Sequence, residues 1–415
     1  MTTSSVWSLL GKRDFVLVWW AGLISGIGNG ALFIALPVYV YTRTSSSLAT
    51  GLSVMAGALA TVVVGQVAGV LVDRWNDRRT MILANLALTG TTLAFLAAPR
   101  GSWWLVLPVA FAQSALSQFL GPAENALLPA LVGQNDLAAA NSLNALNNNL
   151  ARLLGPALGG LLIAAVGFGG VVVADALTYL LAAALVVLVR APTLTRKLPD
   201  ETHPRQFWQE WRAGLRAVRS RPLLTLSFVA AALVGFGEGF ISTLMAPWVR
   251  VVLGGGGLEL GELMSVQAVG GVTAGVLLAG FARRVSAPQL LGWGGLLSGL
   301  FLVAIFNYSL IYPALWPALA LTAVAGLPFT AWGTAQLLLL QTQSEPKVRG
   351  RVFGAYFALF GGAQLLGMAA SGVLGDRLGM LIINVDAATY LLAGAVVLAF
   401  AGRRLRRDVS SSAGG

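Results

Sequence analysis

The sequence contains two copies of one pattern, and this repeat constrains the fold more than any other feature. The first copy has LGPALGG at residues 154–160, a glycine at 167 and DALTYLLA at 175–182. The second has LGMAASG at 366–372, a glycine at 379 and DAATYLLA at 386–393. The copies lie 212 residues apart, and the spacing falls to 211 after the glycine. The chain is therefore predicted to consist of two related halves.

The composition indicates a protein that crosses a membrane many times. Hydrophobic residues make up 57% of the 415 residues and charged residues only 10%, whereas a soluble domain has about 25% charged residues. The chain has no cysteine and one histidine, His203, so disulfides, thiol chemistry and Cys/His metal sites are excluded. We expect no metal and no cofactor. Carboxyl groups remain as the main side chains that could titrate during function.

Twelve stretches are long and apolar enough to cross the hydrocarbon layer, which needs about 20 residues. We predict an all-α membrane protein with twelve transmembrane helices in two pseudo-symmetric six-helix bundles. The predicted spans are 15–41, 48–72, 80–98, 103–131, 138–166, 168–190, 223–249, 261–280, 289–306, 311–335, 352–374 and 380–400.

Basic residues indicate which ends of the spans face the cytoplasm. With both termini inside, 22 of the 27 Lys and Arg residues fall in cytoplasmic segments, as the positive-inside rule requires. The net charge of +11 then reflects topology and contact with anionic lipid headgroups, so nucleic acid is excluded as a partner. We expect a monomeric, multi-pass protein of the plasma membrane.

The polar segments divide the chain into four regions. These are an N-terminal bundle at 1–190, a cytoplasmic linker at 191–222, a C-terminal bundle at 223–402 and a basic cytoplasmic tail at 403–415, of which 410–415 is expected to be disordered. The linker is predicted to hold an amphipathic helix at the membrane surface, with a plain linker helix as the alternative. Its apolar face consists of Phe207, Trp208, Trp211, Leu215 and Val218.

The loop after the second span carries a charged motif. An aspartate followed by basic residues can form a breakable ionic latch at the cytoplasmic face. The motif resembles the cytoplasmic loop signature of the major facilitator superfamily, although Asn76 and Asp77 stand where that family usually has glycine and arginine. The alternative is a positive-inside loop with one charge pair. The matching residues are Gly69, Asp73, Arg74, Arg78 and Arg79.

The fifth span resembles the antiporter motif of the same superfamily, which the family associates with exporters. Spaced small residues end in Gly-Pro-x-x-Gly-Gly, and the alternative is generic small-residue packing with a proline kink. Ser142 and Ala151 replace the two upstream glycines of the motif. The matching residues are Gly155, Pro156, Gly159 and Gly160, where we expect added bulk to block transport rather than folding.

Three further segments narrow the resemblance to one branch. FLGPA at 119–123, ALLPALV at 126–132 and LAAAN at 137–141 resemble the macrolide-efflux branch of the drug:proton antiporters. That branch includes siderophore exporters and lysophospholipid transporters. The resemblance implies the major facilitator fold and export of small amphipathic molecules by alternating access, driven by a proton gradient, with sodium as the other possible ion. A membrane enzyme or a non-transporting sensor is the competing class, and the single histidine argues against an enzyme.

Five ionisable residues lie within the predicted spans, where charges are costly and usually functional. They are Glu124, Arg152, Asp175, Glu238 and Asp386. Asp175 and Asp386 are equivalent in the repeat, which suggests a shared structural role. Glu238 aligns with Asn29, so only one half carries an acid there, and Glu238 is our predicted coupling carboxylate. Arg152 lies at similar depth and is its predicted counter-charge, with Asp175 as an alternating partner.

A central substrate cavity is predicted from aromatic and neutral polar side chains in the spans, because such a lining suits amphipathic molecules. The aromatic candidates are Phe33, Phe240, Trp332, Tyr356 and Phe360. The polar candidates are Asn29, Gln113, Gln336 and Gln364.

Overall fold

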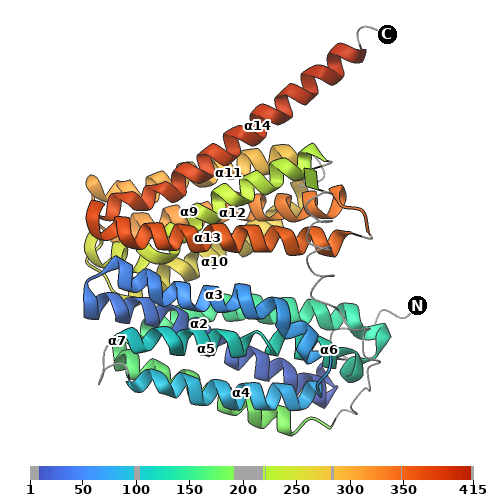
Figure 1. The fold of residues 1–415 in the computed structure, drawn as a ribbon, viewed down its shortest axis with the longest axis vertical. Helices are drawn as coiled ribbons and strands as arrows, with labels where there is room; N and C mark the ends of the chain where they lie inside the picture. Colours follow the sequence, from blue (N-terminus) through green and yellow to red (C-terminus); the bar gives the residue numbers. More distant parts are fainter. Residues whose placement is uncertain are drawn as a thin grey trace. The chain divides into compact units, whose positions relative to one another are not determined.

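The computed structural model describes residues 9–97, 103–190, 218–219, 221–281, 285–346 and 348–412. All regular structure in these ranges is helical (Figure 1). The chain divides into two compact units, as the repeat predicts. Unit 1 comprises Met1–Asp200 together with Gly254–Ser265, and unit 2 comprises Glu201–Leu253 together with Val266–Gly415.

Unit 1 is a bundle of long helices joined by short 3-10 turns. Its helices are α2 (Arg13–Thr44), α3 (Ser47–Val72), α4 (Asp77–Ala94), α5 (Val106–Ser117), α6 (Leu120–Val132) and α7 (Leu137–Val187). Its 3-10 turns are η1 (Phe95–Ala97), η2 (Trp103–Leu105) and η3 (Gln134–Asp136).

Unit 2 repeats this arrangement. Its helices are α9 (Pro222–Val252), α10 (Gly257–Phe281), α11 (Ala287–Asn307), α12 (Leu315–Gln343), α13 (Arg349–Leu378) and α14 (Asn384–Ser412). The 3-10 turns are η4 (Tyr308–Leu310) and η5 (Met380–Ile383). The first turns of α10 belong to unit 1, so this helix is shared between the two units.

The two glycines of the repeat both reverse the chain. Gly167 has φ 70° and Gly379 has φ 77°, a left-handed backbone that glycine adopts without steric cost. Eleven described helical segments are long and apolar enough to span a membrane, and one of them, Gln134–Val187, has 54 residues. A straight helix of that length would measure about 80 Å, far more than a bilayer. Because Gly167 breaks it into two spans, the predicted twelve-span, all-α fold is confirmed.

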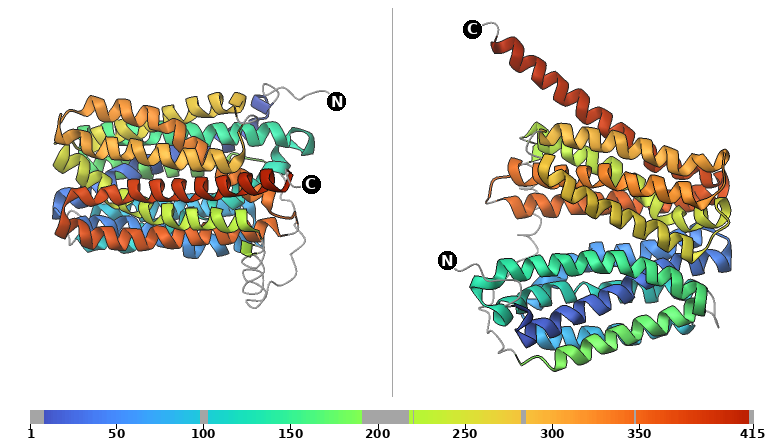
Figure 2. Two further views of the ribbon diagram at one scale, coloured as in Figure 1. Left: turned by 90° about the horizontal axis from the view of Figure 1, so that it is seen from above. Right: turned by 180° about the vertical axis from the view of Figure 1, so that it is seen from behind.

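Two predicted segments differ in the structure. The predicted span 103–131 is interrupted at Gln118 and Phe119, which separate α5 from α6. Pro122 lies in the first turn of α6, where a proline is tolerated, but its ring prevents a continuous helix through this point. The expected disorder at 410–415 is partly wrong, because α14 continues to Ser412, and Figure 2 shows this last helix extending past the rest of its unit. The predicted amphipathic linker helix lies almost wholly outside the described residues.

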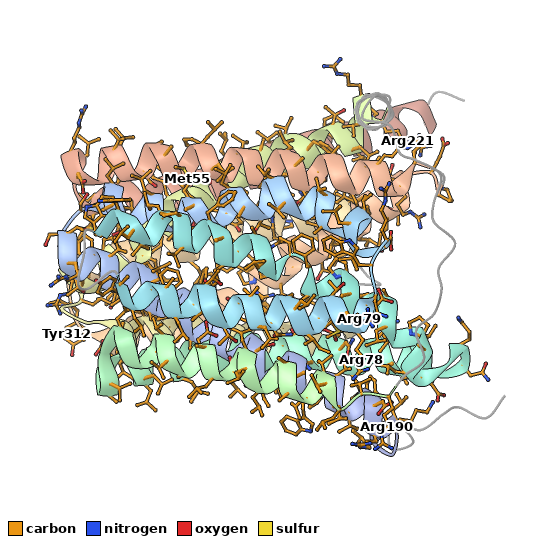
Figure 3. The ribbon with its side chains drawn as sticks, turned by 60° about the horizontal axis from the view of Figure 1, so that its bottom comes forward. Met55, Arg78, Arg79, Arg190, Arg221 and Tyr312 are labelled. Carbon is orange, nitrogen blue, oxygen red and sulfur yellow. The ribbon has the colours of Figure 1, made fainter. Side chains whose placement is uncertain are left out.

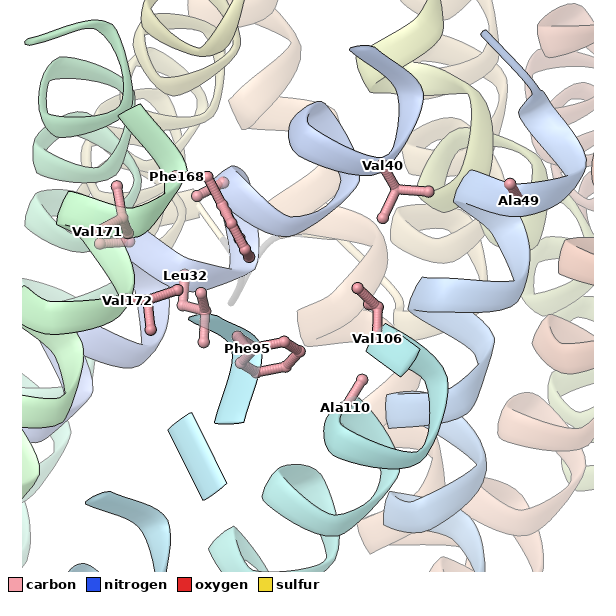
Figure 4. Packing of buried hydrophobic residues seen from close by; sticks show 11 residues of the cluster. Leu32, Val40, Ala49, Phe95, Val106, Ala110, Phe168, Val171 and Val172 are labelled. Carbon is pink, nitrogen blue, oxygen red and sulfur yellow. The ribbon is translucent and has the colours of Figure 1, made fainter. Parts of the chain in front are cut away.

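One of the buried clusters of unit 1 packs around the turn at Gly167. Phe168 stacks on Tyr39 of α2 with ring centroids 4.1 Å apart and meets Phe95 edge-on at 6.2 Å. Val171 and Val172 are fully buried beside them, as Figure 4 shows. This packing fixes the helix after the turn against α2, and Asp175 lies one turn further along it.

Candidate functional site

Asp175 lies in a satisfied polar site inside unit 1. Its side chain is 1% exposed. The Gln113 amide on α5 donates to Asp175 Oδ2 at 3.4 Å, and the Thr178 hydroxyl donates to Asp175 Oδ1 at 3.4 Å. The same amide reaches Thr92 Oγ1 on α4 at 3.3 Å. The acid therefore ties three helices together, which supports the structural role expected for it.

Asp386 occupies the equivalent position in unit 2 with a different set of neighbours. Its side chain is also 1% exposed, but neither carboxyl oxygen has a hydrogen-bond partner. Glu238 follows Gly237 on α9, and a Cβ added at Gly237 would lie 3.0 Å from Asp386 Cα, so the two acids are neighbours. The Tyr390 hydroxyl, one turn after Asp386 on α14, donates to Glu238 Oε1 at 2.8 Å. Glu238 and Asp386 are called the carboxyl pair below.

Helix contacts through glycine hold both aspartates in place. A Cβ atom added at Gly28 of α2 would lie 2.5 Å from Asp175 Oδ1, and one added at Gly237 of α9 would lie 2.8 Å from Asp386 Oδ1. A Cβ atom at these distances would force the carboxylate to shift, so glycine lets each helix approach the aspartate in its present position. The first helix of each unit therefore meets the repeated aspartate through an equivalent glycine.

Aromatic side chains pack against Tyr390, the residue that donates to Glu238. Phe329 and Trp332 of α12 pack edge-on against the Tyr390 ring, with centroid distances of 5.3 Å and 5.6 Å. The helices α11 and α12 contain no charged residue, and α9 contains only Glu238 and Arg250. Arg250 is twelve residues further along α9, or about 18 Å away. No described basic side chain forms an ion pair with Glu238 or Asp386.

The other two ionisable candidates lie on α6 and α7. Glu124 is half-buried, and Asn144 of α7 donates to its Oε1 at 3.0 Å. Arg152 is exposed and forms no ion pair with Asp175, the partner predicted within its own unit. Its predicted pairing with Glu238 involves the other unit and stays a prediction.

The antiporter motif forms close contacts within unit 1. A Cβ at Gly155 would lie 2.9 Å from Gly30 Cα, and one at Gly159 would lie 2.5 Å from Ala31 Cα, both on α2. Gly160 faces the first turn of α10, where its added Cβ would lie 2.5 Å from the Gly257 carbonyl oxygen. Ser142 and Ala151, the two small residues upstream, lie on the same helix, and Pro156 is buried. Because these neighbours are backbone atoms, bulk at Gly159 would disturb the packing of the bundle itself, and we revise the expectation that it would block transport without affecting folding.

The loop motif ends in an arginine that caps a helix. Arg78 donates to the carbonyl oxygens of Val186 at 3.2 Å and Val187 at 2.6 Å, at the C-terminus of α7. A cation is favourable there because the last carbonyls of a helix are unpaired and partly negative. Asp73 caps the end of α3 through its backbone, and the added Cβ at Gly69 would meet open space. Figure 3 shows Arg78, Arg79 and Arg190 at this one end of unit 1.

The predicted cavity residues fall into two groups. Gln113, Phe240, Trp332, Gln336 and Tyr356 are buried within their own units. Gln336 donates to the Ser227 carbonyl oxygen at 3.0 Å and to the Tyr356 hydroxyl at 3.2 Å, so it serves a hydrogen-bond network. The remaining four, Asn29, Phe33, Phe360 and Gln364, are exposed or half-buried. A lining role for any of the nine stays a prediction.

Sequence reasoning missed three features of these sites. Tyr390 was not a candidate, although a tyrosine follows the aspartate in both copies of the repeat and that recurrence was a usable signal. The contacts of Gly28 and Gly237 were also missed.

Within the described residues no group of three or more histidine or acidic side chains could hold a metal ion.

Comparisons with known proteins agree with this architecture. The chain is 25% identical to Macrolide efflux protein A of Streptococcus pyogenes over 94% of this chain and 95% of that protein. It is 28% identical to Enterobactin exporter EntS of Citrobacter koseri over 87% of this chain and 85% of that protein. A crystal structure of a peptide transporter superposes with a TM-score of 0.76 at 15% identity, over 94% of this chain and 95% of that one.

The predicted resemblance to macrolide-efflux and siderophore-export proteins is confirmed by these relatives. Residues 18–367 match the Major Facilitator Superfamily, whose members are transporters rather than enzymes. The chain therefore belongs to the Major Facilitator Superfamily.

Proposed function

We propose that this transporter exports small amphipathic molecules in exchange for protons, by alternating access, with Glu238 as the coupling acid. The observation that carries the proposal is the carboxyl pair. An ionised Asp386, buried beside a half-buried Glu238 carboxylate and without a basic partner, would cost several kcal/mol, so the site favours binding a proton. Acids within membrane spans commonly serve as proton relays.

The relatives and the side chains support an amphipathic substrate. One relative is named for macrolide efflux and another for enterobactin export, so both are candidate substrates of this chain. Aromatic rings and neutral amides suit molecules with apolar bodies and several polar groups. A lysophospholipid is the remaining alternative from the same branch, and sodium is the alternative coupling ion.

The basic residues support the proposed orientation. We place the protein in the plasma membrane with both termini in the cytoplasm. Arg78, Arg79 and Arg190 lie at one end of unit 1, the end that the orientation assigns to the cytoplasm (Figure 3). Anionic headgroups would contact this end, and no further protein partner is required.

Transport in proteoliposomes tests the proposal. Purified protein is reconstituted with a pH-sensitive dye inside, and a pH gradient is imposed in the presence of erythromycin or enterobactin. We expect gradient-driven transport of one probe with accompanying proton flux. Glu238→Gln keeps the shape and hydrogen bonding but cannot titrate, and we expect it to lose at least about 10-fold in driven transport while still binding the probe.

A matched variant controls for the loss of an acid. Glu345 is exposed and pairs with Arg221 at 3.2 Å, away from the carboxyl pair, so Glu345→Gln should transport normally. Full driven transport by Glu238→Gln would contradict the proposal and transfer the role to Glu124 or Asp175. Transport driven by a sodium gradient instead would show that sodium, and not the proton, is the coupling ion.

A further inference from the structure

Asp386 is a buried acid whose oxygens have no hydrogen-bond partner, and the proposed function assigns the coupling proton to Glu238 without giving Asp386 a role of its own. Leaving a buried polar group unpaired costs about 1–3 kcal/mol, and more for a charge. The equivalent Asp175 avoids this cost through Gln113. The repeat spacing of 212 puts Ala325 at the position of Gln113 in unit 2, and alanine has no donor.

We propose that Glu238 and Asp386 form one proton-binding site that shares its protons, with Tyr390 as the residue that positions Glu238. This inference rests on the proposed function and adds a second carboxyl group to it. The Tyr390 hydroxyl donates to one oxygen of Glu238, which favours the ionised form of that acid. The shared proton then resides on Asp386.

This assignment resolves the unpaired oxygens. A protonated Asp386 has an O–H group that can donate, and in the proposed site a carboxylate oxygen of the ionised Glu238 accepts it. The aromatic rings of Phe329 and Trp332 keep the Tyr390 side chain in place for its own hydrogen bond. One proton is thus held at rest and a second can be added.

The chemistry of loading is a simple proton transfer. A hydronium ion gives up a proton: one of its O–H bonds breaks, an O–H bond forms on a carboxylate oxygen of Glu238, and a water molecule is left. The Tyr390 hydroxyl then faces a neutral acid. On release the O–H bond breaks and the proton returns to water. No other bond changes.

The groups around the pair are few. On α14 they are Asp386 and Tyr390, and α13 adds one buried titratable side chain, Tyr356. The segments α11, α12 and η5 contribute no charged side chain. The charged residues of α13 lie near its two ends, at 349, 351, 376 and 377. Titration of the pair is therefore governed by its own two members.

Infrared titration of the purified full-length protein tests this pair without any substrate. The absorption of protonated carboxyl groups is followed as the pH is raised. Two interacting acids lose their protons in two steps that belong to the pair. We expect two steps for the wild type and one step for Asp386→Asn or Glu238→Gln. Tyr390→Phe should keep two steps and change the interval between them.

The repeat supplies matched controls. Asp175→Asn and Tyr179→Phe alter the equivalent residues of unit 1 and should leave both steps of the pair in place. If Asp386→Asn does not fold, the titration of Tyr390→Phe tests the proposal. An unchanged pH interval between its two steps would show that Tyr390 does not position Glu238.

Three outcomes would overturn the pair: a single step in the wild type, two steps remaining in Asp386→Asn, or loss of the protonated signal on adding NaCl at fixed pH. Any of these outcomes rejects the shared site. The transport assay of Glu238→Gln then still tests the proposed function separately. Driven transport by Glu238→Gln would instead reject the proposed function.

Discussion

The two halves of this transporter place an equivalent aspartate against an equivalent glycine and then use it differently. In unit 1 the side chain of Asp175 receives hydrogen bonds from Gln113 and Thr178. In unit 2 Asp386 has no such donor and lies beside a second acid, Glu238. Two positions outside the repeated motif make the difference. Gln113 of unit 1 corresponds to Ala325 of unit 2, and Asn29 of unit 1 corresponds to Glu238 of unit 2. We infer that the repeat preserves a scaffold, and that the residues around each aspartate decide whether it has a structural role or binds protons.

The ion pairs at the ends of the helices are more alike in the two halves than the buried acids at their centres. Lys12 pairs with Asp136 at 2.7 Å in unit 1, and Arg221 pairs with Glu345 at 3.2 Å in unit 2. Lys12 and Arg221 are equivalent by the 209-residue spacing that relates Asn29 to Glu238. Each pair joins the start of the first helix to the segment before α7 or α13. Both halves thus have an ion pair at the same place, and its side chains are more exposed to solvent in unit 2 than in unit 1.

Replacing Gly159 should give the largest effect on stability. Its counterpart in unit 2 is Ser371, a fully buried serine that donates weakly to the Gly239 carbonyl oxygen at 3.4 Å. Gly159 has no such room, since a Cβ there would lie 2.5 Å from Ala31 Cα. We expect Gly159→Leu to lose about 3 kcal/mol and to lower the yield of folded protein. Thermal unfolding in detergent measures this.

A glycine in open space provides the control for that variant. Gly90 on α4 has no atom within 4 Å of an added Cβ, so Gly90→Leu should unfold near the wild-type temperature. Equal stability of the two variants would show that the contact of α7 with α2 tolerates bulk. The asymmetry between Gly159 and Ser371 would then have no packing basis.

Some of this architecture could be predicted from the sequence. Gly167 and Gly379 identified both turns because glycine is the residue that adopts positive φ freely, and the apolar lengths gave the spans. The sequence pattern did not show which helices contact one another. Arg152 was chosen as the partner of Glu238 on depth alone, because a linear sequence gives the depth of a residue and not the face of its helix. Gln113 was assigned to a cavity because an amide looks the same whether it binds substrate or a buried acid.

Removing the donor of Asp175 should have an intermediate effect. Gln113→Leu keeps most of the side-chain volume and leaves the buried acid with Thr178 alone. We expect the free energy of unfolding to fall by about 1–2 kcal/mol, the usual cost of an unpaired buried group. Combining it with Asp175→Asn should give a stability change that is less than additive, because the two residues interact. Strictly additive changes would mean that the amide does not stabilise Asp175, and the contrast between the halves would disappear.

The ion pairs at the ends should give the smallest effects, and unequal ones. The side chains of Lys12 and Asp136 are 35% and 16% exposed, whereas those of Arg221 and Glu345 are 43% and 69% exposed. Exposed pairs contribute about 0–1 kcal/mol because water and salt screen them. Lys12 also donates to the Val132 carbonyl oxygen, which orders it further. We therefore expect Asp136→Asn to cost about 1 kcal/mol and Glu345→Gln less than about 0.5 kcal/mol. Unfolding at low and high salt checks this, and a larger loss for Glu345→Gln would reverse the assigned ranking.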